Sequence, residues 1–81
     1  MQTETNRTIT RLVNTVRSYN ESIRSIKQTR EKLHMRNRQA TLIMLLCRRL
    51  TNTGHRVIMK NGTRIHPGYA YLSIDGIEYP V

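Results

Sequence analysis

The stretch that decides the fold runs from Ile9 to Leu33 and reads ITRLVNTVRSYNESIRSIKQTREKL. Its apolar side chains recur at alternating steps of three and four residues, and only Arg30 interrupts the series. This spacing is the heptad pattern with which one helix packs against another. We therefore predict a long amphipathic helix whose apolar side, called here the heptad stripe, consists of Ile9, Leu12, Val16, Tyr19, Ile23, Ile26 and Leu33.

The size of the chain indicates what the heptad stripe packs against. A chain of 81 residues makes one domain (1–81), which has difficulty burying enough apolar surface alone. Cys47 is the only cysteine, so no disulfide within the chain can help. Its apolar neighbours Leu45 and Leu46 favour a buried thiol over a nucleophile. We expect a homo-oligomer, a dimer or higher, joined through the heptad stripe.

A second stretch, Ala40 to Leu50, is apolar on nearly all sides, as in a buried helix. Its apolar centre near Ile43 would lie almost opposite the heptad stripe if both belonged to one continuous helix. Two geometries remain open: one long helix with different partners at its two ends, or two helices that fold back at a break near His34–Gln39. We favour two helices within a helical region of residues 6–52, which Gly54 closes as a left-handed cap.

Glycine and proline occur only from Gly54 onward, which predicts turns and strands in residues 55–81. The first turn is Asn61-Gly62, a strong signal for a two-residue hairpin loop. It predicts a hairpin in which Val57–Lys60 pairs with Thr63–His66.

A second hairpin is predicted around Asp75-Gly76, with Tyr69–Ile74 pairing with Ile77–Tyr79. One of its faces is wholly apolar and should cover the second helix; it consists of Ala70, Leu72, Ile74, Ile77, Tyr79 and Val81. The sequence thus predicts an α+β fold, with a long coiled-coil-like N-terminal helix, a second buried helix, and a small antiparallel β-sheet of two hairpins.

The charge balance points to polyanionic partners. Fourteen Lys and Arg residues stand against five Asp and Glu, which gives a net charge of +9, and most of the basic residues are arginine. Arginine donates hydrogen bonds in pairs to phosphate and carboxylate groups. We therefore expect nucleic acid, a phosphate-bearing nucleotide or an acidic protein as the partner.

Two basic surfaces are candidates for this binding. The first is a face of the long helix that tracks phosphates without sequence preference, although exposed helix faces are also charged for solubility alone; its residues are Arg11, Arg17, Arg24, Lys32 and Arg38. The second is a phosphate-binding group at the end of the helical region and on the first hairpin: Arg48, Arg49, Arg56, Lys60, Arg64 and His66. Tyr69 and Tyr71 would stack bases beside it, or else pack against a neighbouring subunit or helix.

The sequence shows no site for catalysis, a cofactor or a metal. The acidic residues lie far apart in sequence, so they suggest no acid–base pair. The histidines His34, His55 and His66 are scattered, and a single cysteine gives no metal-binding spacing. No signal peptide or membrane-spanning segment is visible. We expect a non-catalytic cytoplasmic protein.

An alternative function rests on the character of the whole chain. Small size, high arginine content and helices followed by hairpins resemble, in no specific motif, accessory proteins that bacteriophages and mobile elements encode. That resemblance implies an inhibitor of a host defence or regulatory protein, acting by direct protein–protein binding or by sequestering a nucleotide signal.

Overall fold

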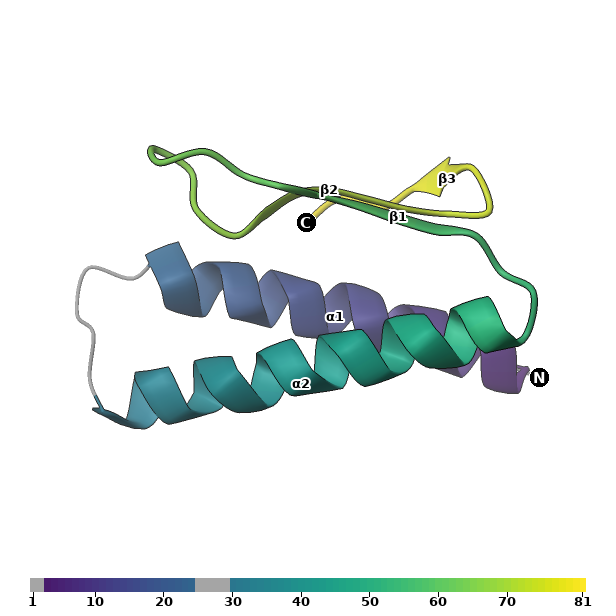
Figure 1. The fold of residues 1–81 in the computed structure, drawn as a ribbon, viewed down its shortest axis with the longest axis horizontal. Helices are drawn as coiled ribbons and strands as arrows, with labels where there is room; N and C mark the ends of the chain where they lie inside the picture. The colour runs from purple at the N-terminus through teal and green to yellow at the C-terminus, as the bar shows by residue number, and fades with distance from the viewer. Residues whose placement is uncertain (1–2, 25–29) are drawn as a thin grey trace.

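The α+β fold is confirmed in a computed structural model, which describes residues 3–24 and 30–81. Two helices lie side by side in opposite directions, and a three-stranded antiparallel sheet lies across one side of the pair (Figure 1). The elements are α1 (Glu4–Arg24), α2 (Arg30–Asn52), β1 (Val57–Asn61), β2 (Tyr69–Ile74) and β3 (Ile77–Glu78).

Local signals in the sequence account for where the helices begin and end. Thr3 caps α1, because its hydroxyl oxygen accepts a hydrogen bond from the Asn6 N–H at 3.1 Å. Gly54 follows α2 with a φ of 88°, and its N–H donates to the carbonyl oxygen of Thr51. This left-handed residue closes the helix as predicted, since glycine adopts a positive φ without steric cost.

The chain does consist of two helices, but the predicted break at His34–Gln39 is wrong. These six residues belong to α2, while α1 ends at Arg24 and α2 begins at Arg30. The segment contains neither glycine nor proline, so its polar side chains interrupt the apolar pattern without interrupting the backbone hydrogen bonds. Polarity alone was therefore a poor marker of a break.

The heptad stripe packs largely inside the chain. Leu12 and Val16 are fully buried in a core with α2 and the sheet, and Ile9 and Tyr19 pack against that core. Leu33, in contrast, belongs to α2 and is 47% exposed. Ile26 lies outside the described residues. The stripe residues at the centre of α1 are therefore too buried to contact a second copy. The oligomer stays a prediction, and it requires a different interface.

The predicted hairpin at Asn61-Gly62 is wrong, because β1 pairs with β2 instead. The register runs from Val57 opposite Ile74 to Lys60 opposite Tyr71. Residues 63–66 form a tight turn in which the Thr63 N–H donates to the His66 carbonyl oxygen at 2.9 Å. Pairing with β2 gives β1 a neighbour that carries two buried apolar side chains, whereas the apolar side chain in residues 63–66 is Ile65, which is 83% exposed.

The second hairpin is present in the predicted register, with Ile74 opposite Ile77 across Asp75-Gly76. Both turn residues have a positive φ, 54° for Asp75 and 83° for Gly76, as its tight loop requires. Of the apolar face predicted for this hairpin, Leu72 and Ile74 are buried. Ala70 and Ile77 are exposed, so the prediction that all six residues cover α2 is wrong.

A bulge in β2 explains why Ala70 is exposed. Lys60 of β1 lies opposite Tyr71, but the next residue, Asn61, lies opposite Tyr69, so Ala70 is left over. One extra residue exchanges the faces on which later side chains lie. Tyr69 therefore packs against the core in the place that regular alternation would give to Ala70.

Asn20 of α1 fastens the helix to the start of β2 and to the last residue of the chain. Its buried amide nitrogen donates to the carbonyl oxygens of Tyr69 at 3.0 Å and Val81 at 2.8 Å. Its amide oxygen accepts from the Tyr69 N–H at 2.8 Å. Gly68 permits this contact, because a Cβ there would lie 2.3 Å from that oxygen. One buried side chain thus satisfies three partly buried backbone groups.

Asp75 stabilises the β2–β3 turn in a way that depends on pH. Its carboxylate accepts a hydrogen bond from the Arg56 N–H at 2.9 Å and lies 2.7 Å from Nδ1 of His55. The backbone hydrogen bond from Arg56, and then the one from His55, hold the pKa of Asp75 below its ordinary 3.8. This pKa difference between the folded and unfolded states links folding to pH.

We expect the urea midpoint of unfolding to fall between about pH 6 and about pH 3, with part of that fall due to Asp75. Because the folded pKa is lowered, the contribution of Asp75 is complete above the unfolded pKa and is lost as pH falls through the folded one. Asp75→Asn, which tolerates a positive φ, should lower the midpoint at the higher pH and reduce its pH dependence. Glu78→Gln is the matched control, and an equal effect there would contradict the assignment.

Candidate functional site

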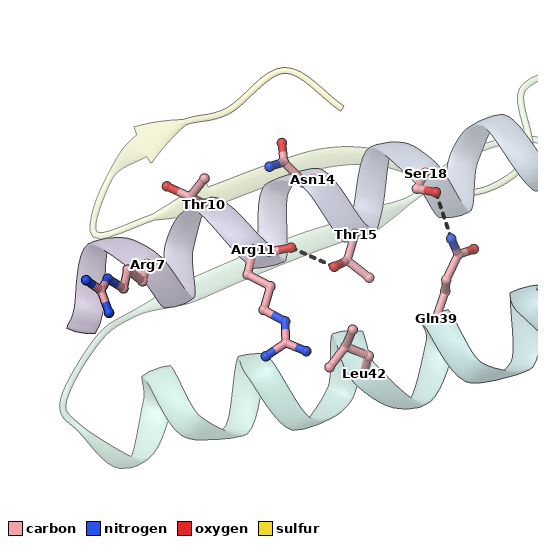
Figure 2. Close-up of a pocket in the computed structure, with 8 residues that line it drawn as sticks. All are labelled: Arg7, Thr10, Arg11, Asn14, Thr15, Ser18, Gln39 and Leu42. Carbon is pink, nitrogen blue, oxygen red and sulfur yellow. Dashed lines mark hydrogen bonds between the residues drawn. The ribbon is translucent and has the colours of Figure 1, made fainter. Parts of the chain in front are cut away.

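The side of the helix pair away from the sheet carries a shallow hollow of about 480 Å³ between α1 and α2. Counting about 100° per residue, Arg11 and Ser18 lie on the opposite side of α1 from Asn20 and Arg24, which bond to the sheet layer. Figure 2 shows the residues that line the hollow: Arg7, Thr10, Arg11, Asn14, Thr15, Ser18, Gln39 and Leu42.

The inner end of this hollow is polar and fixed. Nε2 of Gln39 donates to the Ser18 hydroxyl at 2.7 Å and so joins the two helices. The Gln39 Oε1 atom is buried and has no hydrogen-bond partner among the described residues. The Arg11 guanidinium extends from α1 toward α2 near Leu42 (Figure 2). The hollow thus presents a cationic group beside fixed polar side chains.

A second hollow adjoins the first and shares Arg11 with it. Arg48 and Arg49, near the C-terminal end of α2, line this second hollow together with Leu45. The N-terminal end of α1 lies beside the C-terminal end of α2, which brings together four arginines from the two helices (Figure 1). We call Arg7, Arg11, Arg48 and Arg49 the arginine cluster.

The arginine cluster is not neutralised by the rest of the described chain. Among the described residues, none of its four guanidinium groups has a hydrogen-bond or ion-pair partner, and the ion pair present there joins His55 to Asp75. Glu4 lines a hollow with Arg49, but its carboxylate lies beyond ion-pair distance. The cluster is therefore available to bind anions.

The second predicted basic group is divided by the fold. Arg48 and Arg49 lie at one end of the molecule, near Arg56, whereas Arg64 and His66 lie in the turn after β1 at the other end (Figure 1). Between them runs β1, whose five residues span roughly 17 Å. These residues therefore do not form one compact group, and phosphate binding by them stays a prediction. Lys60 lies apart again, with its ammonium 5.2 Å from the centre of the Tyr71 ring.

The predicted basic helix face is also divided. Nε of Arg17 donates to the Pro80 carbonyl oxygen at 2.7 Å, and Nε of Arg24 donates to the Pro67 carbonyl oxygen at 3.0 Å. Both side chains lie toward the sheet, while Arg11 lies on the other side of α1. Arg38 is exposed on α2, and the side chain of Lys32 lies outside the described part. Arg7 was missed, although its spacing of four residues from Arg11 placed both on one side of a helix.

The two tyrosines proposed for base stacking point to different sides. The Tyr69 ring lies 5.6 Å from the Tyr19 ring and packs against the core. Burial raises the pKa of Tyr69, and the nearby Tyr19 and Cys47 raise it further. Tyr71 is half-buried beside Lys60. The prediction of an exposed pair of stacking rings is therefore wrong, and Tyr69 instead packs against a helix of its own chain.

Cys47 lies in an apolar setting, as its sequence neighbours indicated. Its thiol donates to the Met59 sulfur at 3.5 Å, and burial raises the pKa of the Cys47 thiol. A raised pKa keeps the thiol protonated and weakly nucleophilic. Within residues 3–24 and 30–81, no three His, Cys, Asp or Glu side chains gather closely enough to hold a metal ion. Neither described helix is long and apolar enough to cross a membrane.

Comparison with known proteins gives no independent indication of function. None of the protein-family models, curated proteins or solved structures compared with this chain matches it. The arginine cluster must therefore be interpreted from its own geometry and charge.

Proposed function

We propose that this chain is a non-catalytic cytoplasmic protein that binds nucleic acid through the arginine cluster. One observation carries the proposal: guanidinium groups from two antiparallel helices converge on two adjoining hollows, with no carboxylate paired to them in the described chain. A net charge of +9 extends the attraction to the whole molecule.

The geometry favours contact with phosphates over contact with bases. Arg11 lies between the two hollows, so Arg7 on one side and Arg49 on the other can hold successive phosphates along a backbone. Contacts of this kind fix the position of a nucleic acid without carrying sequence information. The proposed binding is therefore independent of sequence and depends strongly on salt, since each bound phosphate releases counterions.

The test is fluorescence anisotropy with labelled DNA and RNA oligonucleotides of mixed sequence, single-stranded and duplex, over a series of salt concentrations. Arg11→Gln and Arg49→Gln should each raise Kd about tenfold at low salt, equivalent to roughly 1.4 kcal/mol. Each should also reduce the slope of log Kd against log salt by about one. Arg64→Gln, at the far end of the molecule, is the control. An affinity unchanged by salt, or equal losses with the control, would refute the proposal.

A second candidate is an acidic protein partner, such as a host protein that the chain inhibits. It is favoured by Leu45, which is 54% exposed in the same hollow as Arg48 and Arg49. An apolar side chain among arginines suits an acidic and partly apolar protein surface better than a phosphate backbone. Leu45→Gln should leave oligonucleotide binding unchanged. If the protein binds no oligonucleotide and no cyclic nucleotide but retains one host protein, this second candidate replaces the first.

A further inference from the structure

Strand β1 has a free edge. The sheet order is β1-β2-β3, so β1 has a neighbour on one side only. In an antiparallel sheet, the N–H and C=O groups of successive residues point to opposite edges of the strand. The Tyr79 N–H donates to the Leu72 carbonyl oxygen, so the backbone groups of Leu72 point to β3 and those of the next residue, Ser73, point to β1. Ser73 lies opposite Ile58, whose backbone groups therefore bond to β2, while those of the neighbouring Val57 and Met59 point away from the sheet.

These outward backbone groups are unpaired within the described part of the chain. Neither Val57 nor Met59 has a hydrogen bond on that side. A strand edge of this kind readily pairs with another strand unless charge, proline or a covering segment blocks it. In β1 the sequence is VIMKN, which contains a single charge and no proline.

An uncharged strip of α2 lies beside this edge. The Cys47 thiol contacts Met59 of β1, which fixes the side of α2 that faces the strand. Met44 and Thr51, three residues before and four residues after Cys47, lie on the same side of the helix. The same spacing continues toward the start of α2, so that the strip beside β1 comprises Asn37, Ala40, Met44, Cys47 and Thr51. Leu33 follows the same spacing but lies about 21 Å along the helix from Cys47, beyond the end of the strand. Met44 is 57% exposed there.

The absence of charge from this strip matters in a chain with a net charge of +9. Two copies repel each other unless they meet where few cations lie. None of the strip residues is charged, and Arg7, Arg11 and Arg49 of the arginine cluster lie on other sides of the helix pair. Arg48, four residues after Met44, borders the strip.

We propose that two copies of the chain join through antiparallel pairing of β1 with β1, which merges their sheets and brings the two uncharged strips together beneath them. An antiparallel edge is self-complementary under a two-fold axis. Placing Met59 opposite Met59 sets Val57 opposite Asn61, so that outward backbone groups meet outward ones. Lys60 then lies opposite Ile58, and no two cations of β1 face each other directly.

A second copy fits this surface better than an unrelated extended peptide. A peptide strand could satisfy Val57 and Met59, but it would leave the Met44 side chain exposed. A second copy supplies its own strip for Met44 to pack against, since the two-fold axis that pairs the strands also relates the helices. Met44 and Cys47 line neither hollow of the arginine cluster, so the dimer is inferred from observations other than those that support nucleic-acid binding.

The test begins with sedimentation equilibrium of the full chain, which should report a dimer. Met44→Arg should give a folded monomer with an unchanged circular dichroism spectrum, because it places two guanidinium groups in the joint. Met35→Arg is the matched control: it lies on the same helix, is 52% exposed against 57% for Met44, and points to the opposite side. It should remain a dimer.

Amide hydrogen exchange then tests the pairing itself. In the parent, the N–H groups of Val57, Ile58, Met59 and Lys60 should all exchange slowly. In Met44→Arg, Val57 and Met59 should exchange quickly, while Ile58 and Lys60 stay protected by β2. A monomeric parent, a Met44→Arg variant that stays dimeric, or a dimer in which Val57 and Met59 exchange as fast as in the monomer would each overturn the proposal.

Discussion

Replacing Asn20 by alanine is expected to lower the free energy of unfolding by about 3 kcal/mol or more. The amide of Asn20 serves the N–H and C=O of Tyr69 and the C=O of Val81, all at hydrogen-bond distance. Alanine would remove all three hydrogen bonds from a partly buried site and leave a cavity where the Asn20 side chain is now buried. The loss is a large fraction of the total stability of a domain this small. Urea unfolding followed by circular dichroism measures it.

Two further variants make this expectation specific. Asn14→Ala changes the same residue type on an exposed turn of the same helix and should alter stability by less than about 0.5 kcal/mol. Asn20→Asp keeps an acceptor for the Tyr69 N–H but turns a carboxylate toward two carbonyl oxygens, so it should be at least as unstable as the alanine variant at neutral pH. Equal stability of Asn20→Ala and Asn14→Ala would show that the contact contributes nothing.

Leu12→Ala is expected to cost about 2–5 kcal/mol, the usual range for a buried leucine that leaves a cavity. Leu33→Ala, the same substitution at the other end of the heptad stripe, should change stability by less than about 0.5 kcal/mol. The difference follows from the structure, where Leu12 is fully buried in the core and Leu33 is 47% exposed. The measurement is again the urea midpoint and slope.

This pair of variants separates two interpretations of the stripe. If the stripe joined copies of the chain, both substitutions would weaken the assembly, and both effects would depend on protein concentration. If it packs inside one chain, the cost of Leu12→Ala should be the same in the monomeric Met44→Arg background. A large effect of Leu33→Ala, comparable to that of Leu12→Ala, would contradict the intramolecular packing.

The parts of the fold that could be predicted are those with local causes. The helix end at Gly54 and the turn at Asp75-Gly76 need only a positive φ, which nearby residues determine. The burial of Ile43 and Leu46 follows from helical periodicity. Asn61-Gly62 carried an equally strong local signal, but the hairpin predicted there does not form. Strand β1 pairs instead with β2, which lies further along the chain. Competition between strands cannot be judged from a turn alone.

The candidate site was predicted in fragments. Arg11, Arg48 and Arg49 were each named, but on two different surfaces, since their meeting depends on how the two helices fold against each other. Arg17 and Arg24 were assigned to phosphate binding because sequence cannot show that their partners are carbonyl oxygens 63 and 43 residues away. Asn20 had no distinguishing signal, because all its hydrogen-bond partners are at least 49 residues distant.

The unpaired Ala70 gives the segment before Leu72 an unusual freedom. Its side chain is exposed, so its chemical identity is nearly free. Its presence is nearly free as well, because without it Tyr69 would directly precede Tyr71, and strict alternation would keep the Tyr69 ring on the same side as Leu72. The contact between the Tyr69 and Tyr19 rings should therefore survive the loss of this residue. Relatives should vary in chemistry at this position and tolerate a gap there, and a shortened strand should pair with β1 without the bulge.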